Sequence, residues 1–316
     1  MPRFPAAPKR ALVRAVNTGG HEDLEGPHPS TLEADPVPDP TQPGPGQRWS
    51  TWRSVAKGQR GPDPHPDWLV TLDAAFDTEL GILKTGKEAD AFLIERAVPP
   101  GAGPAGATAE RCLLVAKRYR SLEHGQFHRG TEYTEGRRVR RTRDQRAMED
   151  RKSAWGRAVS ATQWADAEFV ALRDLWSAGA PVPYPVQIDG TEVLMEFVGT
   201  EVTDEAGRTQ AVAAPRLTRE RPSDDLLESY WEQLTHGMAV LARLGFAHGD
   251  LSPYNILADG ERLVIIDLPQ VVDLVSNPFA SDVLLRDCRT VCAWFAARGL
   301  DADADALFAD LLAQAL

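Results

Sequence analysis

Long apolar runs are missing from this 316-residue chain. No stretch of about 18 apolar residues occurs, so we expect no transmembrane helix. The segment after Met1 has no apolar region of the kind found in secretory signals. Cysteine is scarce, and Cys112, Cys288 and Cys292 match neither a metal-binding spacing nor an even set of disulfides. These absences lead us to expect a cytoplasmic protein that does not associate with membranes.

Positive charge is outnumbered by negative charge overall, with 35 Lys/Arg against 46 Asp/Glu, but it is concentrated in one region. The net charge is −11, and hydrophobic residues make up 42% of the chain, as in ordinary globular proteins. Between Lys117 and Arg157, 13 Lys/Arg residues face only 6 Asp/Glu, a local charge of about +7. A basic segment within an acidic chain points to a separate role for that segment.

The first residues contain little that could form regular structure. Ten prolines fall among the first 50 residues, so we expect residues 1–48 to be a disordered extension. Residues 49–75 are predicted to form a helical or linker segment. Trp49 and Trp52 are three residues apart and would share one face of a helix.

Hydrophobic periodicity predicts strands in the first part of the chain and helices in the second. Strands are expected on both sides of a turn at residues 85–87, and two further apolar strands at 112–117 and 193–198, the latter broken by Gly199. Apolar spacing predicts helices that end before Gly179 and Gly245. The predicted helices are 164–178, 226–244, 282–298 and 303–316, and one more strand is expected at 263–266.

The strongest chemical signal is the segment that begins His248-Gly249-Asp250. Asp250 and Asn255 are five residues apart on a loop, and Asp267 follows twelve residues later at the end of an apolar strand. Phosphoryl transfer requires positioned metal ions and a group that orients the nucleophile. Asp250 would accept the hydroxyl proton, while Asn255 and Asp267 would supply oxygen ligands for Mg²⁺. His248 is expected to hold the loop.

Lys117 ends a predicted strand, where its side chain could reach phosphate groups. A carboxylate on the next helix would hold it in place. Glu168 is the natural partner, with Asp166 as a nearby competitor.

The segment from Gly81 to Lys87 nearly matches a Walker A loop. It departs from that motif because Glu88 stands where a Ser or Thr should contact Mg²⁺, and because a strand follows it where a Walker loop opens a helix. We therefore interpret it as a turn between two strands. Its backbone N–H groups and Lys87 would cover nucleotide phosphates.

Together these segments resemble the RIO family of atypical serine/threonine protein kinases, nearest its RIO-one subfamily. The resemblance covers roughly residues 75–300, and the basic run after Lys117 fits it. It departs at Lys84, where the family's loop usually begins with Ser. Four segments carry the resemblance: Lys84-Thr85-Gly86-Lys87-Glu88-Ala89-Asp90-Ala91-Phe92, Val115 to Tyr119, His248 to Leu257, and Ile265-Ile266-Asp267-Leu268-Pro269-Gln270.

The resemblance implies an α+β, two-lobed protein-kinase-like fold with ATP and Mg²⁺ in the cleft. A small β-rich N-lobe would cover 76–198, with a flexible basic loop at 118–157, and a mainly helical C-lobe would cover 199–316. Thr85, Gly86, Lys87 and Glu88 would lie at the phosphates. Met195 would take the gatekeeper position, and the backbones of Glu196 and Val198 would bind adenine. Some family members act as ATPases that form a phospho-aspartate, for which Asp267 is the candidate here.

Two other functions fit part of the sequence. A small-molecule kinase of the aminoglycoside or choline phosphotransferase type shares the His-Gly-Asp loop, although Leu268-Pro269-Gln270 favours the RIO family. The basic loop 118–157 could instead contact RNA or the ribosome through phosphate groups. The phosphoryl acceptor is not indicated by any motif. Candidate autophosphorylation sites in the basic loop are Ser121, Thr131, Thr134, Thr142 and Ser153.

Overall fold

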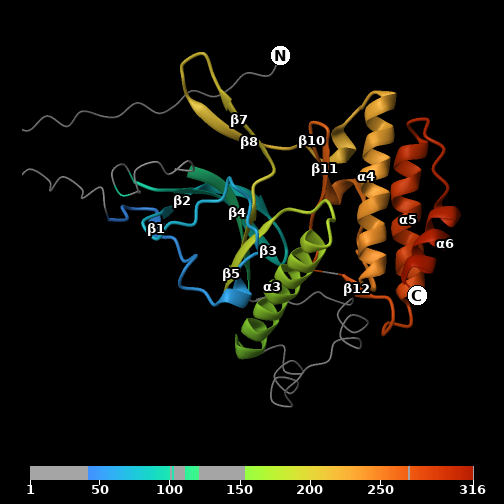
Figure 1. The fold of residues 1–316 in the computed structure, drawn as a ribbon, viewed down its shortest axis with the longest axis horizontal. Coiled ribbons are helices and arrows are strands. Elements are labelled where there is room, and N and C mark those ends of the chain that lie inside the picture. Colours follow the sequence, from blue (N-terminus) through green and yellow to red (C-terminus); the bar gives the residue numbers. More distant parts are fainter. Residues whose placement is uncertain (1–41, 100–101, 103–110, 121–153, 270, 316) are drawn as a thin grey trace, which may run out of the picture. The chain divides into compact units, whose positions relative to one another are not determined.

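An antiparallel sheet of six strands forms the first part of the described chain (Figure 1). The computed structural model describes residues 42–99, 102, 111–120, 154–269 and 271–315, all of which belong to a unit that spans Asp39–Leu316. The strand order is β1-β2-β3-β4-β6-β5. The strands are β1 (Gln47–Trp49), β2 (Phe76–Thr85), β3 (Ala89–Ala97), β4 (Arg111–Tyr119), β5 (Pro185–Asp189) and β6 (Glu192–Glu196).

The two faces of this sheet pack against different partners. Alternate residues of β4 point to opposite sides. Val115 and Tyr119 pack with the long helix α3 (Ala154–Ser177), whereas Leu114 and Ala116 pack with the segment that follows β1. That segment contains the 3₁₀ helix η1 (Lys57–Gln59) and contributes Trp52, Leu69 and Val70 to the core. The sheet is therefore covered on both sides, and Lys117 lies on the same face as Val115 and Tyr119.

Three helices and several short strand pairs form the second part of the chain (Figure 1). The helices are α4 (Asp224–Arg243), α5 (Ala280–Ala296) and α6 (Ala304–Ala315), which pack against one another. Two antiparallel pairs carry the loops of interest: β10 (Ile256–Asp259) with β11 (Arg262–Ile265), and β9 (Phe246–Ala247) with β12 (Val272–Asp273). The short 3₁₀ helices η2 (Leu217–Arg219) and η3 (Pro253–Asn255) complete this part. The α+β, two-lobed kinase-like architecture expected from the sequence is confirmed.

The predicted helix face shared by Trp49 and Trp52 is wrong. Trp49 lies in β1 opposite Phe76 of β2, and the two rings meet edge to face at 4.6 Å. Trp52 lies in a turn and is buried in the core. Ordered structure also begins earlier than expected, because Gln47 and Arg48 already belong to β1. A long-range strand pairing determines this segment, and a local three-residue spacing cannot reveal it.

A second hairpin was not predicted. β7 (Gly199–Thr203) and β8 (Thr209–Ala213) form a separate pair directly after the end of the sheet. Gly199, interpreted as a strand breaker, is the first residue of β7. Only glycine fits at this position, because a Cβ atom there would lie 2.3 Å from the carbonyl oxygen of Val212. Within the described ranges, no helix is both long and apolar enough to cross a membrane. Residues 1–41 and 121–153, which hold most of the predicted disordered extension and basic loop, lie outside the described structure.

Candidate active site

Lys117 lies between carboxylates from two separate elements. It stands near the end of β4, and its Nζ is 2.6 Å from Glu168 Oε1 on α3 and 2.9 Å from Asp267 Oδ1 after β11. Burial lowers the pKa of Lys117, but both carboxylates more than offset this and hold the pKa above its usual value. Lys117 is thus a permanently charged group. Asp166, the competing candidate partner, is exposed, so the geometry selects Glu168.

Tyr119 holds the other oxygen of Glu168. Its hydroxyl donates a hydrogen bond of 2.5 Å to Glu168 Oε2. Burial, followed by the charge of Glu168, raises the pKa of Tyr119 well above its usual value, so the phenol remains a donor. The two oxygens of one buried carboxylate therefore bind a lysine and a tyrosine that are two residues apart on β4. Sequence reasoning missed Tyr119, although its place two positions after Lys117 puts it on the same face.

Asp267 adopts a backbone conformation that is uncommon for residues other than glycine. Its φ of 70° lies in the left-handed region, and it is the only non-glycine residue with positive φ in the described part of the chain. Such a conformation costs about 1–3 kcal/mol and occurs most often at functional positions. Burial raises the pKa of Asp267, but Lys117 outweighs this and holds the pKa below its usual range. The carboxylate is therefore ionised and directed at Lys117.

Asp250 and Asn255 are joined in one loop, as the sequence predicted. Asn255 Nδ2 donates to the carbonyl oxygen of Asp250 at 2.8 Å and lies 3.4 Å from Asp250 Oδ2. The Asp250 side chain is exposed, whereas Asn255 is buried. Because Ile266 N–H donates to Asn255 O at 2.9 Å, this loop is bound directly beside Asp267. The arrangement brings a solvent-accessible carboxylate and two oxygen ligands into one region.

His248 is buried and holds the loop, as expected. Its Nε2 is 3.1 Å from the carbonyl oxygen of Ile266, and its Nδ1 accepts the N–H of Asp250 at 3.3 Å. Burial lowers the pKa of His248, so the ring is neutral at pH 7 with its proton on Nε2. The imidazole therefore connects the Asp250 loop to the residue before Asp267.

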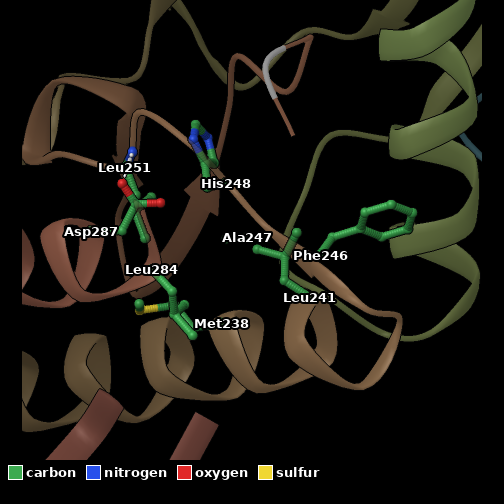
Figure 2. A pocket seen from close by; sticks show the side chains of 8 residues that line it. All are labelled: Met238, Leu241, Phe246, Ala247, His248, Leu251, Leu284 and Asp287. Carbon is green, nitrogen blue, oxygen red and sulfur yellow. Dashed lines mark hydrogen bonds between the residues drawn. The ribbon is translucent and has the colours of Figure 1, made fainter. Parts of the chain in front are cut away.

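Asp287 of α5 is a second residue that the sequence interpretation missed. Its carboxylate accepts the backbone N–H of Gly249 at 2.8 Å and that of Leu251 at 3.2 Å, on either side of Asp250. Figure 2 shows Asp287 beneath this loop, beside a small pocket. Burial raises the pKa of Asp287 to about 6, although both backbone donors oppose this. The other lining residues are Met238, Leu241, Phe246, Ala247, His248, Leu251 and Leu284.

The turn between β2 and β3 is the segment that the sequence predicts to cover the nucleotide phosphates. Gly86 N–H donates to Ala89 O at 3.0 Å, and Arg120 binds both Asp90 and the carbonyl oxygen of Gly86. Thr85 and Lys87 are exposed, while Glu88 is partly buried. Burial and then the nearby charge of Asp267 raise the pKa of Glu88. The predicted turn is confirmed and lies near Asp267; its role at the phosphates stays a prediction.

The predicted adenine-binding segment follows β6. Met195 is buried opposite Val115 of β4, at the edge of the face that carries Lys117. Glu196 N–H donates to Tyr184 O at 2.9 Å, so only the carbonyl of Glu196 could serve a base. Val198 O accepts the N–H of Ala214 at 3.0 Å, while Val198 N–H has no backbone partner among the residues described. The carbonyl oxygen of Glu196 and the N–H of Val198 are thus the candidate acceptor and donor for the edge of a purine base.

The donor set for a metal ion is small. No group of three His, Cys, Asp or Glu side chains arranged to hold a metal occurs among the described residues. Mg²⁺ usually needs only one or two protein oxygens, because phosphates and water complete its shell. Asp267 is ionised, and the amide nitrogen of Asn255 is occupied by Asp250, which leaves the Asn255 oxygen for a cation. The two predicted ligands therefore fit Mg²⁺ bound together with a phosphate group.

Comparison with known proteins adds independent evidence. The family model of the RIO domain matches residues 122–307. "RIO-type serine/threonine-protein kinase Rio1" of Haloferax volcanii is 33% identical over 241 residues, which cover 76% of this chain and 71% of the relative. This chain belongs to the RIO family. The resemblance to the RIO-one kinases noted in the sequence is thereby confirmed, and a small-molecule kinase is not favoured.

Other RIO proteins match over shorter lengths. "Serine/threonine-protein kinase RIO1" of Chaetomium thermophilum is 34% identical over 150 residues, which cover 45% of this chain but only 27% of that protein. A solved structure, "Crystal structure of the Rio2 kinase-ADP/Mg2+-phosphoaspartate complex from Chaetomium thermophilum", matches with a TM-score of 0.47 at 21% identity and covers 75% of this chain and 62% of that one. The RIO relatives thus include proteins with long regions that this chain does not match.

Proposed function

We propose that this chain is a RIO-type serine/threonine protein kinase that uses ATP and Mg²⁺. The observation that carries the proposal is the position of Lys117, bound to Glu168 of α3 and to Asp267 after β11, in the region that also holds the Asp250–Asn255 loop. A fixed lysine and two oxygen ligands match the needs of phosphoryl transfer, in which positioning and charge compensation dominate.

Each residue has a separate task in this mechanism. Lys117 binds negative phosphate oxygens, and Glu168 and Tyr119 keep its ammonium group in place. Asp267 and Asn255 would hold Mg²⁺, which compensates phosphate charge when it is bound. Asp250 is exposed and accepts the proton of the acceptor hydroxyl while that oxygen bonds to the γ-phosphorus. The bond from the γ-phosphorus to the bridging oxygen breaks, and ADP leaves.

The test replaces Asp250. The Asp250→Ala variant should lose at least about 100-fold in phosphoryl transfer, the usual contribution of a general base, while it still binds ATP. Transfer would be measured with radiolabelled ATP and cell lysate, and binding by calorimetry. Asp301→Ala, which alters an exposed carboxylate without a described partner, serves as the control. Normal transfer by the Asp250 variant would contradict the mechanism.

The same reactions separate protein phosphorylation from ATP hydrolysis. Release of ADP without labelled protein would identify an ATPase, and an acid-labile label on the chain itself would indicate a phospho-aspartate. Asp267 is the candidate for that intermediate, since it is ionised and lies beside Lys117. A phosphoester on the chain would direct attention to the five candidate sites in the basic loop, which lie outside the described residues.

The basic loop 118–157 remains our proposed contact for RNA or the ribosome. Its 12 Lys/Arg and 6 Asp/Glu residues give a local charge of about +6, which supports electrostatic binding to phosphates that would weaken steeply with salt. A location in the cytoplasm also stays a prediction.

A further inference from the structure

The sheet face that carries Lys117 also carries a second lysine. Lys84 of β2 is paired with Ala91 of β3, and Ala91 is paired with Lys117 of β4. Residues directly opposite on antiparallel strands point to the same side of a sheet. Lys84 and Lys117 therefore project from one face, two strand spacings or about 10 Å apart.

The local structure of β2 directs Lys84 into this row. The pairing of β2 with β3 shifts between Ile82 and Lys84, so Leu83 is an extra residue without a partner on β3. Such bulges re-aim the side chains that follow them. Ala91, which separates the two lysines, has only a methyl group. The space above it is therefore not filled by a longer side chain from the same row.

The two lysines differ in what already binds them. Lys117 contacts both Glu168 and Asp267, so two carboxylates share its charge. Lys84 is exposed and makes no ion pair within the described residues. Lys84 is thus a cation on the same sheet face as Lys117, and no carboxylate of the described residues pairs with it.

We propose that Lys84 binds the terminal phosphates of a nucleoside triphosphate. Lys117 would contact the other end of the same phosphate chain. This inference rests on the proposed function, which places a triphosphate in the cleft. Glu168 and Asp267 bind Lys117, and Glu88 lies close enough to interact with all three, so the charge of Lys117 is more than balanced before a ligand enters. A triphosphate carries several negative charges, so a further cation beside Mg²⁺ and Lys87 would stabilise it, and the flexible stem of Lys84 can place one there.

The experiment compares nucleotides that differ only in their phosphates. Calorimetry with Mg²⁺ would measure the dissociation constants of ATP, ADP and adenosine for the full chain and for Lys84→Met. ATP should bind about tenfold more weakly to the variant, as expected for the loss of one hydrogen bond to a charged group. ADP should lose less, and adenosine should bind equally well. Lys84→Arg keeps the charge and should restore most of the ATP affinity.

Lys57→Met is the matched control, because Lys57 is an exposed lysine in η1 without an ion pair in the described structure. The proposal is overturned if Lys84→Met binds ATP as the unaltered chain does, or if it loses adenosine binding to the same extent as ATP binding. A chain that binds ATP through Lys84 but transfers no phosphoryl group would refute the proposed function alone. A chain that binds no ATP at all would refute both.

Discussion

Asp287 illustrates how one residue can organise a catalytic loop without belonging to its motif. It lies on the buried face of α5, which also carries Leu284, Cys288 and Val291. A carboxylate on an otherwise apolar helix face is uncommon and normally has a partner. Here the partners are two backbone N–H groups around Asp250. The signal was present in the sequence, but its target could be found only from the fold.

The raised pKa of Asp287 predicts a dependence of stability on pH. The pKa is about 6 in the folded chain against 3.8 for an ordinary aspartate, so the folded state holds this proton more tightly than the unfolded state. The contribution of Asp287 is therefore fully present below about pH 4 and is lost as the pH rises through 6. Asn at this position does not titrate. The quantity to measure is the free energy of unfolding of the unaltered chain minus that of Asp287→Asn. This difference should fall by up to about 3 kcal/mol as the pH rises from 4 to 7.5.

Urea denaturation at both pH values measures this difference. Asp282→Asn, an exposed change in the first turn of α5, gives the background dependence on pH. A difference between the chain and its Asp287 variant that does not change with pH would show that Asp287 is already ionised throughout, because its two backbone donors outweigh burial.

At the scale of elements, periodicity succeeded where one face of an element is apolar. Helices α4 and α5 and strands β4, β6 and β11 were predicted within a few residues, because their burial follows the local period. α3 begins at Ala154, ten residues before the predicted start at Trp164. The short strand β1 was missed because it pairs with the distant strand β2. Strands β7 and β8 pair with each other in a mostly exposed hairpin that has no apolar face to produce a period, and the short strand β5, which pairs with its neighbour β6, is buried at most positions and so does not alternate.

The candidate site was predicted to a similar extent. Motif residues such as Lys117, Asp250 and Asp267 could be named because their spacing is characteristic, and the fold brings them together. Tyr119 and Asp287 could not, since each acts through a group on another element. The ion pair between Asp77 of β2 and Arg96 of β3 was also missed. Its two residues are 19 positions apart, and each alternates with ordinary strand residues.

That ion pair supports a prediction on the stability of the sheet. Arg96 is fully buried and binds Asp77 through two hydrogen bonds of 2.6 and 3.0 Å, and Gln187 of β5 through a third of 3.1 Å. Asp77→Ala would leave a buried guanidinium without its counter-charge, so it should lower the free energy of unfolding by about 3–5 kcal/mol. Thermal and urea denaturation would measure the loss.

The double variant Asp77→Leu with Arg96→Met provides the comparison for this pair. Replacing both charges with apolar side chains should recover most of the stability, because the cost of a buried ion pair is similar to its gain. If Asp77→Ala unfolds as the unaltered chain does, solvent reaches Arg96 and the pair contributes little.

On the scale of the whole molecule, the site depends on a contact between its two parts. Lys117 comes from the sheet and Asp267 from the loop after β11, and a hydrogen bond of 2.9 Å joins them. Arg262 of β11 makes a second link by binding Glu196 at the end of β6. Because Asp267 is both the partner of Lys117 and a candidate metal ligand, a bound Mg²⁺ would compete with Lys117 for one carboxylate. The balance between them should depend on the bound nucleotide.

This competition gives opposite expectations for Asp267→Asn with and without metal. With Mg²⁺, the variant should bind ATP about tenfold or more weakly, because an anionic ligand is lost. Without Mg²⁺, it should bind ATP at least as well as the unaltered chain, because a negative charge near the phosphates is gone and Lys117 has one fewer carboxylate to bind. Calorimetry in both buffers, with Asp301→Asn as the exposed control, measures the two effects. Equal weakening in both buffers would mean that Asp267 acts on the nucleotide through the fold and not through the metal.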